Sequence, residues 1–204
     1  MKKMFLLAGI LATVMFVSCS KDEKKEEAPA TSYQFKSTEK IEAKNIEAGK
    51  GRKKGERGTA FEDFLKFNFS ENKIVEGDNW DIAFKGTTII VNGGTPSDPK
   101  IKITGKGAIY VTDGTLESVT SAEFEKLKQN SLNNFKEWAT YTGHPTHLIK
   151  ATPGKILVIR THDEKFVKLR IDSYYQNKAD LESEASHLTT KDKDGYFTFT
   201  FIKG

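Results

Sequence analysis

The stretch Phe197-Thr198-Phe199-Thr200-Phe201, close to the C-terminus of this chain of 204 residues, alternates aromatic and polar side chains. In an extended strand, successive side chains point to opposite faces of the sheet. The three phenylalanines therefore share one face and the two threonines share the other, which is typical of a half-buried strand. This stretch predicts a β-sheet that packs an aromatic face into the core.

The same alternation occurs at residues 65–69, where Leu65, Phe67 and Phe69 share a face, and at residues 167–171. Shorter runs that are typical of strands lie at residues 80–84, 87–91, 101–104, 108–111 and 156–160. Five polar residues, 161–165, separate two of these runs and predict a hairpin. Because hairpins join antiparallel neighbours, we expect a predominantly antiparallel, all-β fold.

One segment has a different pattern. Thr120 and Glu123 have the spacing of a helical capping box, and the apolar residues that follow have near-helical spacing: Phe124, Leu127, Leu132, Phe135 and Trp138. The segment 121–138 therefore predicts a helix. The expected architecture is a single β domain with at least one helix on or beside the sheet.

The N-terminus has the features of a lipoprotein signal peptide. Lys2 and Lys3 precede a mainly apolar run over residues 4–17, and Ser18 precedes Cys19. The run is shorter than the roughly 20 residues that a membrane-spanning helix needs, so we expect cleavage after residue 18 and lipid attachment to Cys19. The other interpretation is an ordinary signal peptide with an incidental cysteine.

Residues 19–31 predict a lipidated cysteine followed by a flexible tether, because the segment is charged and has little apolar surface to bury. Lys21, Asp22 and Glu23 resemble the surface-export signal of Bacteroidetes lipoproteins, although a generic solvated linker has the same composition. The β domain is then expected over residues 32–204, anchored at the outer membrane and exposed at the cell surface. Cys19 is the one cysteine in the chain, so no disulfide is available to the domain.

The charge and the motifs exclude several classes of function. Lys2 and Lys3 supply two of the net +4 charges, and the small remainder does not suggest a nucleic-acid partner. No nucleophile with its base, phosphate-binding loop or catalytic metal cluster is recognisable, so we expect a protein that is not an enzyme. Asn92-Gly93-Gly94 follows a predicted strand but precedes Thr95-Pro96, which suits a turn and not a dinucleotide site.

The chain has four histidines, and two of them lie in Gly143-His144-Pro145-Thr146-His147. A neutral imidazole is the commonest side-chain metal ligand, and glycine and proline shape a loop that presents the rings. His144 and His147 are therefore candidate ligands. His162 and His187 are expected to be ordinary polar residues.

Several motifs, in this order, resemble the HmuY family of haem-binding surface lipoproteins from about residue 61 to the C-terminus. They are Asn79-Trp80-Asp81-Ile82-Ala83, Asn92-Gly93-Gly94, the strand pair around residues 158–160 and 166–169, Asp172-Ser173-Tyr174-Tyr175, and the stretch at 197–201. The resemblance implies an all-β, HmuY-like single domain with a helix, which clamps haem between loops. It also implies iron acquisition, with haem or a related porphyrin passed to an outer-membrane haem transporter.

The founding member of that family holds haem iron between two histidines from separate loops, and some relatives use methionines instead. The resemblance implies His144 as one axial ligand, and residues 105–137 contain no histidine for the other. Tyr110 is the one tyrosine within residues 105–137 and is a candidate tyrosinate ligand. The simpler interpretation is that Tyr110 is an aromatic residue of a strand and packs in the core.

His144 and His147 are too close in sequence to bind opposite sides of one iron, and they would better suit a small ion such as zinc or copper. Haem held by one ligand, or by apolar contact alone, stays possible. The alternative function is a surface interaction or adhesion module of the same family that has lost haem ligation.

Overall fold

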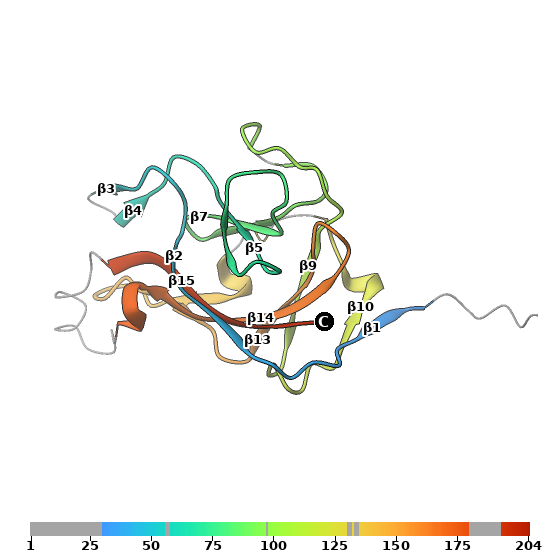
Figure 1. Cartoon of the computed structure of the whole chain (residues 1–204). Helices are drawn as coiled ribbons and strands as arrows, with labels where there is room; N and C mark the ends of the chain where they lie inside the picture. The colour runs from blue at the N-terminus through green and yellow to red at the C-terminus, as the bar shows by residue number, and fades with distance from the viewer. Residues whose placement is uncertain (1–29, 56–57, 97, 130–131, 133–134, 180–192) are drawn as a thin grey trace, which may run out of the picture.

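A five-stranded antiparallel sheet is the largest sheet of the computed structural model, which describes residues 30–204 apart from 56–57, 97, 130–131, 133–134 and 180–192 (Figure 1). Every neighbouring pair in this sheet is antiparallel. In spatial order its strands are β2 (Ile41–Glu47), β15 (Asp194–Lys203), β14 (Phe166–Tyr175), β13 (Lys155–Arg160) and β9 (Ala108–Asp113).

A second antiparallel sheet has four strands, in the order β6 (Lys73–Val75), β5 (Leu65–Asn68), β7 (Ile82–Lys85) and β8 (Thr88–Val91). Three two-stranded pairs complete the described strands: β1 (Ser32–Gln34) with β10 (Ser121–Glu123), β3 (Lys53–Gly55) with β4 (Gly58–Ala60), and β11 (Ala139–Tyr141) with β12 (Ile149–Ala151). The predicted all-β, predominantly antiparallel fold is confirmed.

The main core lies where the aromatic faces of the two sheets meet. Phe197, Phe199 and Phe201 of β15 are fully buried, as the alternation predicts. The Phe84 ring of β7 lies 4.6 Å from the Phe197 ring between centroids, and the Phe67 ring of β5 lies 5.3 Å from the Phe199 ring. Tilted and edge-on aromatic pairs of this kind contribute about 0.5–1.5 kcal/mol each beyond the burial of their area.

The opposite face of the five-stranded sheet is also covered, which the sequence did not indicate. The segment around Leu116, Val119 and Ala122 packs on it and forms a second apolar cluster. Lys168, expected on the solvent side of its strand, is consequently buried. Its ammonium donates a hydrogen bond to the Val119 carbonyl at 2.9 Å and lies 4.9 Å from the centre of the Phe35 ring.

The helix predicted over residues 121–138 is wrong. The segment begins as strand β10, and its described helical parts are two 3-10 turns, η1 (Phe124–Lys126) and η2 (Phe135–Glu137); a third, η3 (Gln176–Lys178), follows β14. Two bridges hold the segment extended, Lys128 with Ile109 and Leu132 with Ile89. The asparagines and the serine among residues 130–134 are poor helix formers, so pairing of this segment with the sheets is favoured over a helix. No helix within the described residues is long and apolar enough to cross a membrane.

The strand predicted at residues 101–104 is also absent. The buried Asn92 side chain takes the place of a partner strand, because its Oδ1 accepts hydrogen bonds from the backbone nitrogens of Thr104 and Gly105 at 2.8 and 3.0 Å. Its Nδ2 donates to the carbonyls of Asp78 and Trp80. Asn92-Gly93 is therefore the structural turn that the sequence suggested.

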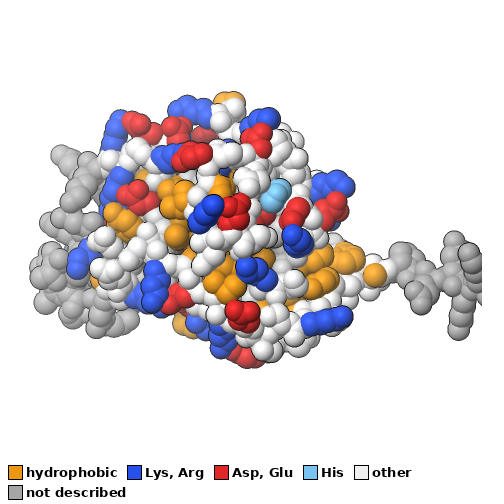
Figure 2. Space-filling view, in the orientation of Figure 1, with side chains coloured by type: hydrophobic (Ala, Val, Ile, Leu, Met, Phe, Trp, Pro, Cys, Tyr) orange, Lys and Arg blue, Asp and Glu red, His pale blue; other side chains and the backbone are white. Residues whose placement is uncertain are grey.

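The visible surface carries acidic and basic side chains intermixed, without a large patch of one sign (Figure 2). Many of the described charges are paired across loops, such as Lys106 with Glu164 at 2.8 Å and Lys100 with Asp63 at 3.1 Å. Exposed pairs of this kind contribute little to stability.

Candidate functional site

The loop that carries the paired histidines connects β11 to β12. Residue Leu148, buried at the end of the loop, anchors it to the core. The Thr142 hydroxyl accepts a hydrogen bond from the Leu148 nitrogen at 2.8 Å and lies 2.7 Å from the Thr146 hydroxyl. The His147 nitrogen donates to the Gly143 carbonyl at 2.6 Å. These bonds hold the loop in a compact turn.

His144 and His147 are both exposed at this turn. Their ring centroids lie 5.9 Å apart and the rings are almost perpendicular, at 85°. The Tyr141 hydroxyl forms a hydrogen bond with His147 Nδ1. Within the described part of the chain, the His144 ring makes no hydrogen bond, so its unprotonated nitrogen is available to a ligand.

The spacing of the two histidines suits a pair of axial haem ligands poorly, as the sequence predicts. Axial ligands bind from opposite sides of the porphyrin plane, so a chain that supplies both must pass around the edge of the macrocycle. The two residues between His144 and His147 span at most about 10 Å of extended chain, and this turn is closed by hydrogen bonds. The loop can therefore supply no more than one of two opposite axial ligands.

The hairpin is fixed to the five-stranded sheet through Tyr175. The Ile149 backbone nitrogen donates a hydrogen bond to the Tyr175 hydroxyl at 2.9 Å. Desolvation by burial is the largest effect on Tyr175 and raises its pKa to about 12. The hydroxyl consequently stays protonated and neutral at physiological pH, and its lone pair holds β12 against the end of β14.

Tyr110 lies elsewhere on the fold. It is paired with Val158 of β13, which is paired with Lys168 of β14, whereas the histidine hairpin contacts β14 at Tyr175. At about 3.3 Å per residue, the intervening part of β14 spans roughly 20 Å. The structure therefore does not bring Tyr110 together with His144.

The surroundings of Tyr110 are those of a strand aromatic. Its hydroxyl accepts a hydrogen bond from the Glu123 backbone nitrogen at 3.1 Å, and the ring packs against the second apolar cluster. It also lines a cavity of about 580 Å³ with the apolar residues Ile109, Val111 and Leu132 and the charged residues Glu125, Lys126, Lys128 and Glu137. This cavity combines apolar side chains with charges of both signs.

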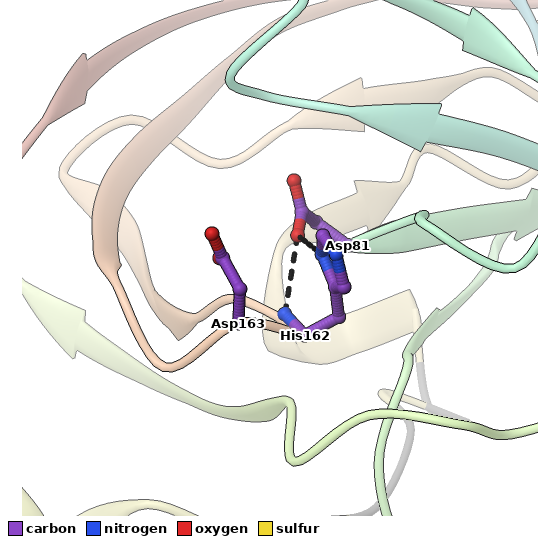
Figure 3. Close-up of side chains that lie close together, drawn as sticks. All are labelled: Asp81, His162 and Asp163. Carbon is purple, nitrogen blue, oxygen red and sulfur yellow. Dashed lines mark hydrogen bonds and ion pairs between the residues drawn. The ribbon is translucent and has the colours of Figure 1, made fainter.

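A third group of side chains was not recognised from the sequence. Asp81, directly before β7, is almost fully buried, and its Oδ1 accepts hydrogen bonds from His162 Nδ1 at 2.6 Å and from the His162 backbone nitrogen at 3.1 Å (Figure 3). Its Oδ2 accepts one from the Phe69 nitrogen at 2.8 Å. Asp81 thus joins the four-stranded sheet to the β13–β14 loop.

Asp163 lies beside this pair at the surface. Partial desolvation opposes its ionisation, but hydrogen bonds donated by Lys165 and Thr161 outweigh that effect and lower the pKa of its carboxyl.

His162, expected to be an ordinary polar residue, instead has its imidazole held in place by the hydrogen bond to Asp81. The motif Asn79-Trp80-Asp81 marked Asp81 as part of a family pattern, but no spacing in the sequence linked it to His162.

The structure thus combines antiparallel sheets with two histidines displayed on a surface hairpin. The family model described as HmuY protein matches residues 60–200. The chain belongs to the HmuY family, and the predicted resemblance is confirmed.

Solved structures of low sequence identity overlap with the chain. They include apo PinO from Porphyromonas gingivitis, with 8% identity, coverage of 82% of this chain and 98% of that chain, and a TM-score of 0.42. The apo HmuY analogue of Tannerella forsythia has 12% identity, coverage of 80% and 95%, and a TM-score of 0.40. A search of curated proteins finds no significant match. The family assignment rests on the sequence match over residues 60–200.

Cys19, the predicted site of lipid attachment, lies outside the described residues, as do the signal peptide and nearly all of the tether. The roles predicted for residues 1–31 therefore stay predictions.

Proposed function

We propose that this protein binds haem or a related porphyrin through His144 and does not act as an enzyme. The observation that carries the proposal is the exposed His144 imidazole, unbonded within the described residues, on a braced hairpin of an HmuY-family fold. A neutral imidazole nitrogen donates its lone pair to ferric iron, as in many haem proteins. His147 is the weaker candidate because the family resemblance implies His144, and not His147, as the axial ligand.

The positions of the candidate ligands predict how the bound iron is coordinated. His147 cannot reach the opposite side of the iron, and Tyr110 lies at a distant part of the sheet. We therefore expect ferric haem with one protein ligand, in a five-coordinate or high-spin state. A haem held by one ligand is released more readily than one held by two, which suits a protein that passes haem to an outer-membrane transporter.

An absorbance titration of the purified protein with ferric haem tests the proposal. We expect a Soret band that differs from that of free haem, a high-spin visible spectrum, and loss or a strong shift of these bands in His144→Ala. His147→Ala is the matched control, since it removes a ring from the same loop, and its spectrum should change less. A wild-type spectrum identical to that of free haem would exclude haem binding and favour the interaction or adhesion module.

The cavity beside Tyr110 is a second candidate place for a porphyrin, with apolar side chains for the ring and Lys128 for a propionate. Glu125 and Glu137 in the same lining oppose an anion, and Lys126 is paired with Glu123 at 2.8 Å. Tyr110→Phe distinguishes the two places. It should leave the spectrum unchanged if His144 is the ligand. It should remove phenolate-to-iron charge-transfer bands if Tyr110 is the ligand.

The proposed cellular setting is the outer membrane, with the protein held by lipid on Cys19 and exposed at the cell surface. Acyl chains on one cysteine supply the anchoring, so Cys19→Ala should leave the protein unprocessed or release it from membranes. Replacement of Lys21, Asp22 and Glu23 by alanine should reduce its accessibility to protease on intact cells. A correctly cleaved Cys19→Ala variant that still fractionates with membranes would contradict the anchor.

A further inference from the structure

Asp81, His162 and Asp163 offer three ligand atoms that all lie within 4.8 Å of one another. From this arrangement we propose a second binding site, for a divalent transition-metal ion such as Zn²⁺, where the β13–β14 loop meets the four-stranded sheet. The proposal does not depend on haem binding, because none of these residues belongs to the β11–β12 hairpin.

The donor set suits such an ion. One imidazole and two carboxylates are ligands that Zn²⁺ accepts, with bonds of about 2.0–2.2 Å. Ligand atoms around a tetrahedral ion then lie about 3.3 Å apart, so the group must rearrange by at most about 1.5 Å. Asp163 is in an exposed loop and can make that movement, whereas Asp81 is held by the sheet.

The buried Asp81 carboxylate is positioned for this role. The backbone nitrogens of His162 and Phe69 donate to its two oxygens and fix its orientation. These bonds need not break, because the ion replaces only the contact between Asp81 Oδ1 and His162 Nδ1. The single proton of a neutral His162 then resides on Nε2, and Nδ1 donates its lone pair to the ion. Water completes the coordination on the exposed side.

The Lys165 ammonium is the competing cation, since it lies 2.8 Å from Asp163 Oδ2. Its side chain is largely exposed, so it can leave Asp163 when an ion arrives. This pairing predicts that removal of the Lys165 charge tightens metal binding, whereas a purely structural role for the cluster predicts no such effect.

The test is a calorimetric titration of the purified, chelator-treated protein with Zn²⁺, carried out in a His144→Ala, His147→Ala background that removes the exposed pair. We expect one ion per chain and a rise in Tm of about 5–10 °C when the free ion is at a hundredfold excess over Kd. Asp163→Asn should weaken binding about tenfold or more, and Lys165→Ala should strengthen it.

His162→Gln is the sharper variant, because the glutamine amide can still donate to Asp81 while the imidazole is lost. Zn²⁺ should no longer raise its Tm. If this variant unfolds, Asp163→Asn at the surface still decides the question. Failure of Zn²⁺ to bind the background protein, or equal binding by Asp163→Asn and the background protein, would overturn the proposal. The haem spectrum reports on His144 and is independent of both outcomes.

Discussion

Gly93 lies so close to Gly107 that a Cβ atom on Gly93 would meet the Gly107 carbonyl oxygen at 1.9 Å. The neighbouring Asn92 carbonyl accepts a hydrogen bond from the Gly107 nitrogen at 2.8 Å. The end of β8 and the segment leading to β9 are thus in direct backbone contact. Glycine is required at residue 93 because of this close approach.

Gly93→Ala should therefore destabilise the fold by about 3 kcal/mol or more, because the added methyl group forces two backbone segments apart. The measurement is the free energy of unfolding in urea. Gly77→Ala is the control, since its Cβ would meet only Asn79 Oδ1 at an ordinary 3.5 Å. A Gly93→Ala variant as stable as Gly77→Ala would show that the approach is looser than described.

Asn92→Ala should cost about 2–4 kcal/mol, because the fully buried Asn92 side chain makes hydrogen bonds to backbone groups of four residues, and all of them are lost together. The side chain accepts from two backbone nitrogens and donates to two carbonyls. Asn79→Ala is a suitable comparison, because within the described residues the exposed Asn79 side chain bonds to the exposed Glu71 alone. Equal losses of stability in the two variants would argue against a central role for Asn92.

The sequence predicts the parts of this fold that depend on local patterns. Alternation at residues 65–69, 167–171 and 197–201 identifies β5, β14 and β15, because one face of each strand packs into the main core. The pattern fails where tertiary contacts prevail. Lys168 alternates like a solvent-facing residue, yet a covering segment far away in sequence buries it.

In the candidate sites too, the sequence predicts what depends on local patterns and does not predict what depends on tertiary contacts. The proximity of His144 and His147 follows from their spacing in the sequence, and the glycine and proline around them correctly indicate a loop. The contact between Asp81 and His162 joins residues 81 positions apart, and no local pattern reveals it. Likewise, the sequence could name Tyr110 as a candidate ligand, but its distance from His144 depends on the order of strands in the sheet.

Lys168→Met should change stability by no more than about 1 kcal/mol at neutral pH, because relief from charge burial offsets the lost bond to Val119. Desolvation lowers the pKa of Lys168, and the Glu117 charge opposes this. Between the lowered folded pKa and the unfolded value of 10.5, the unfolded chain binds more protons, so this residue makes stability rise with pH. Urea unfolding from about pH 7 to 10 should show that contribution in the wild type and not in Lys168→Met. Parallel pH profiles would contradict it.

Tyr175→Phe should cost about 1–2 kcal/mol, because the Ile149 nitrogen loses its acceptor where the histidine hairpin joins the sheet. Burial keeps the folded tyrosine protonated to about pH 12, whereas its ordinary pKa is 10.0. The unfolded chain therefore releases its proton first, so the stability that this residue confers is complete below about pH 10 and is lost as the pH rises towards 12. Phenylalanine cannot ionise, so Tyr175→Phe should lose less stability over that interval.

Urea unfolding on both sides of pH 10 measures the difference in stability between Tyr175→Phe and the wild type. Tyr141→Phe, which changes an exposed hydroxyl on the same hairpin, is the control. If Tyr141→Phe lowers stability as much as Tyr175→Phe, the hairpin is not fixed to the sheet through Tyr175.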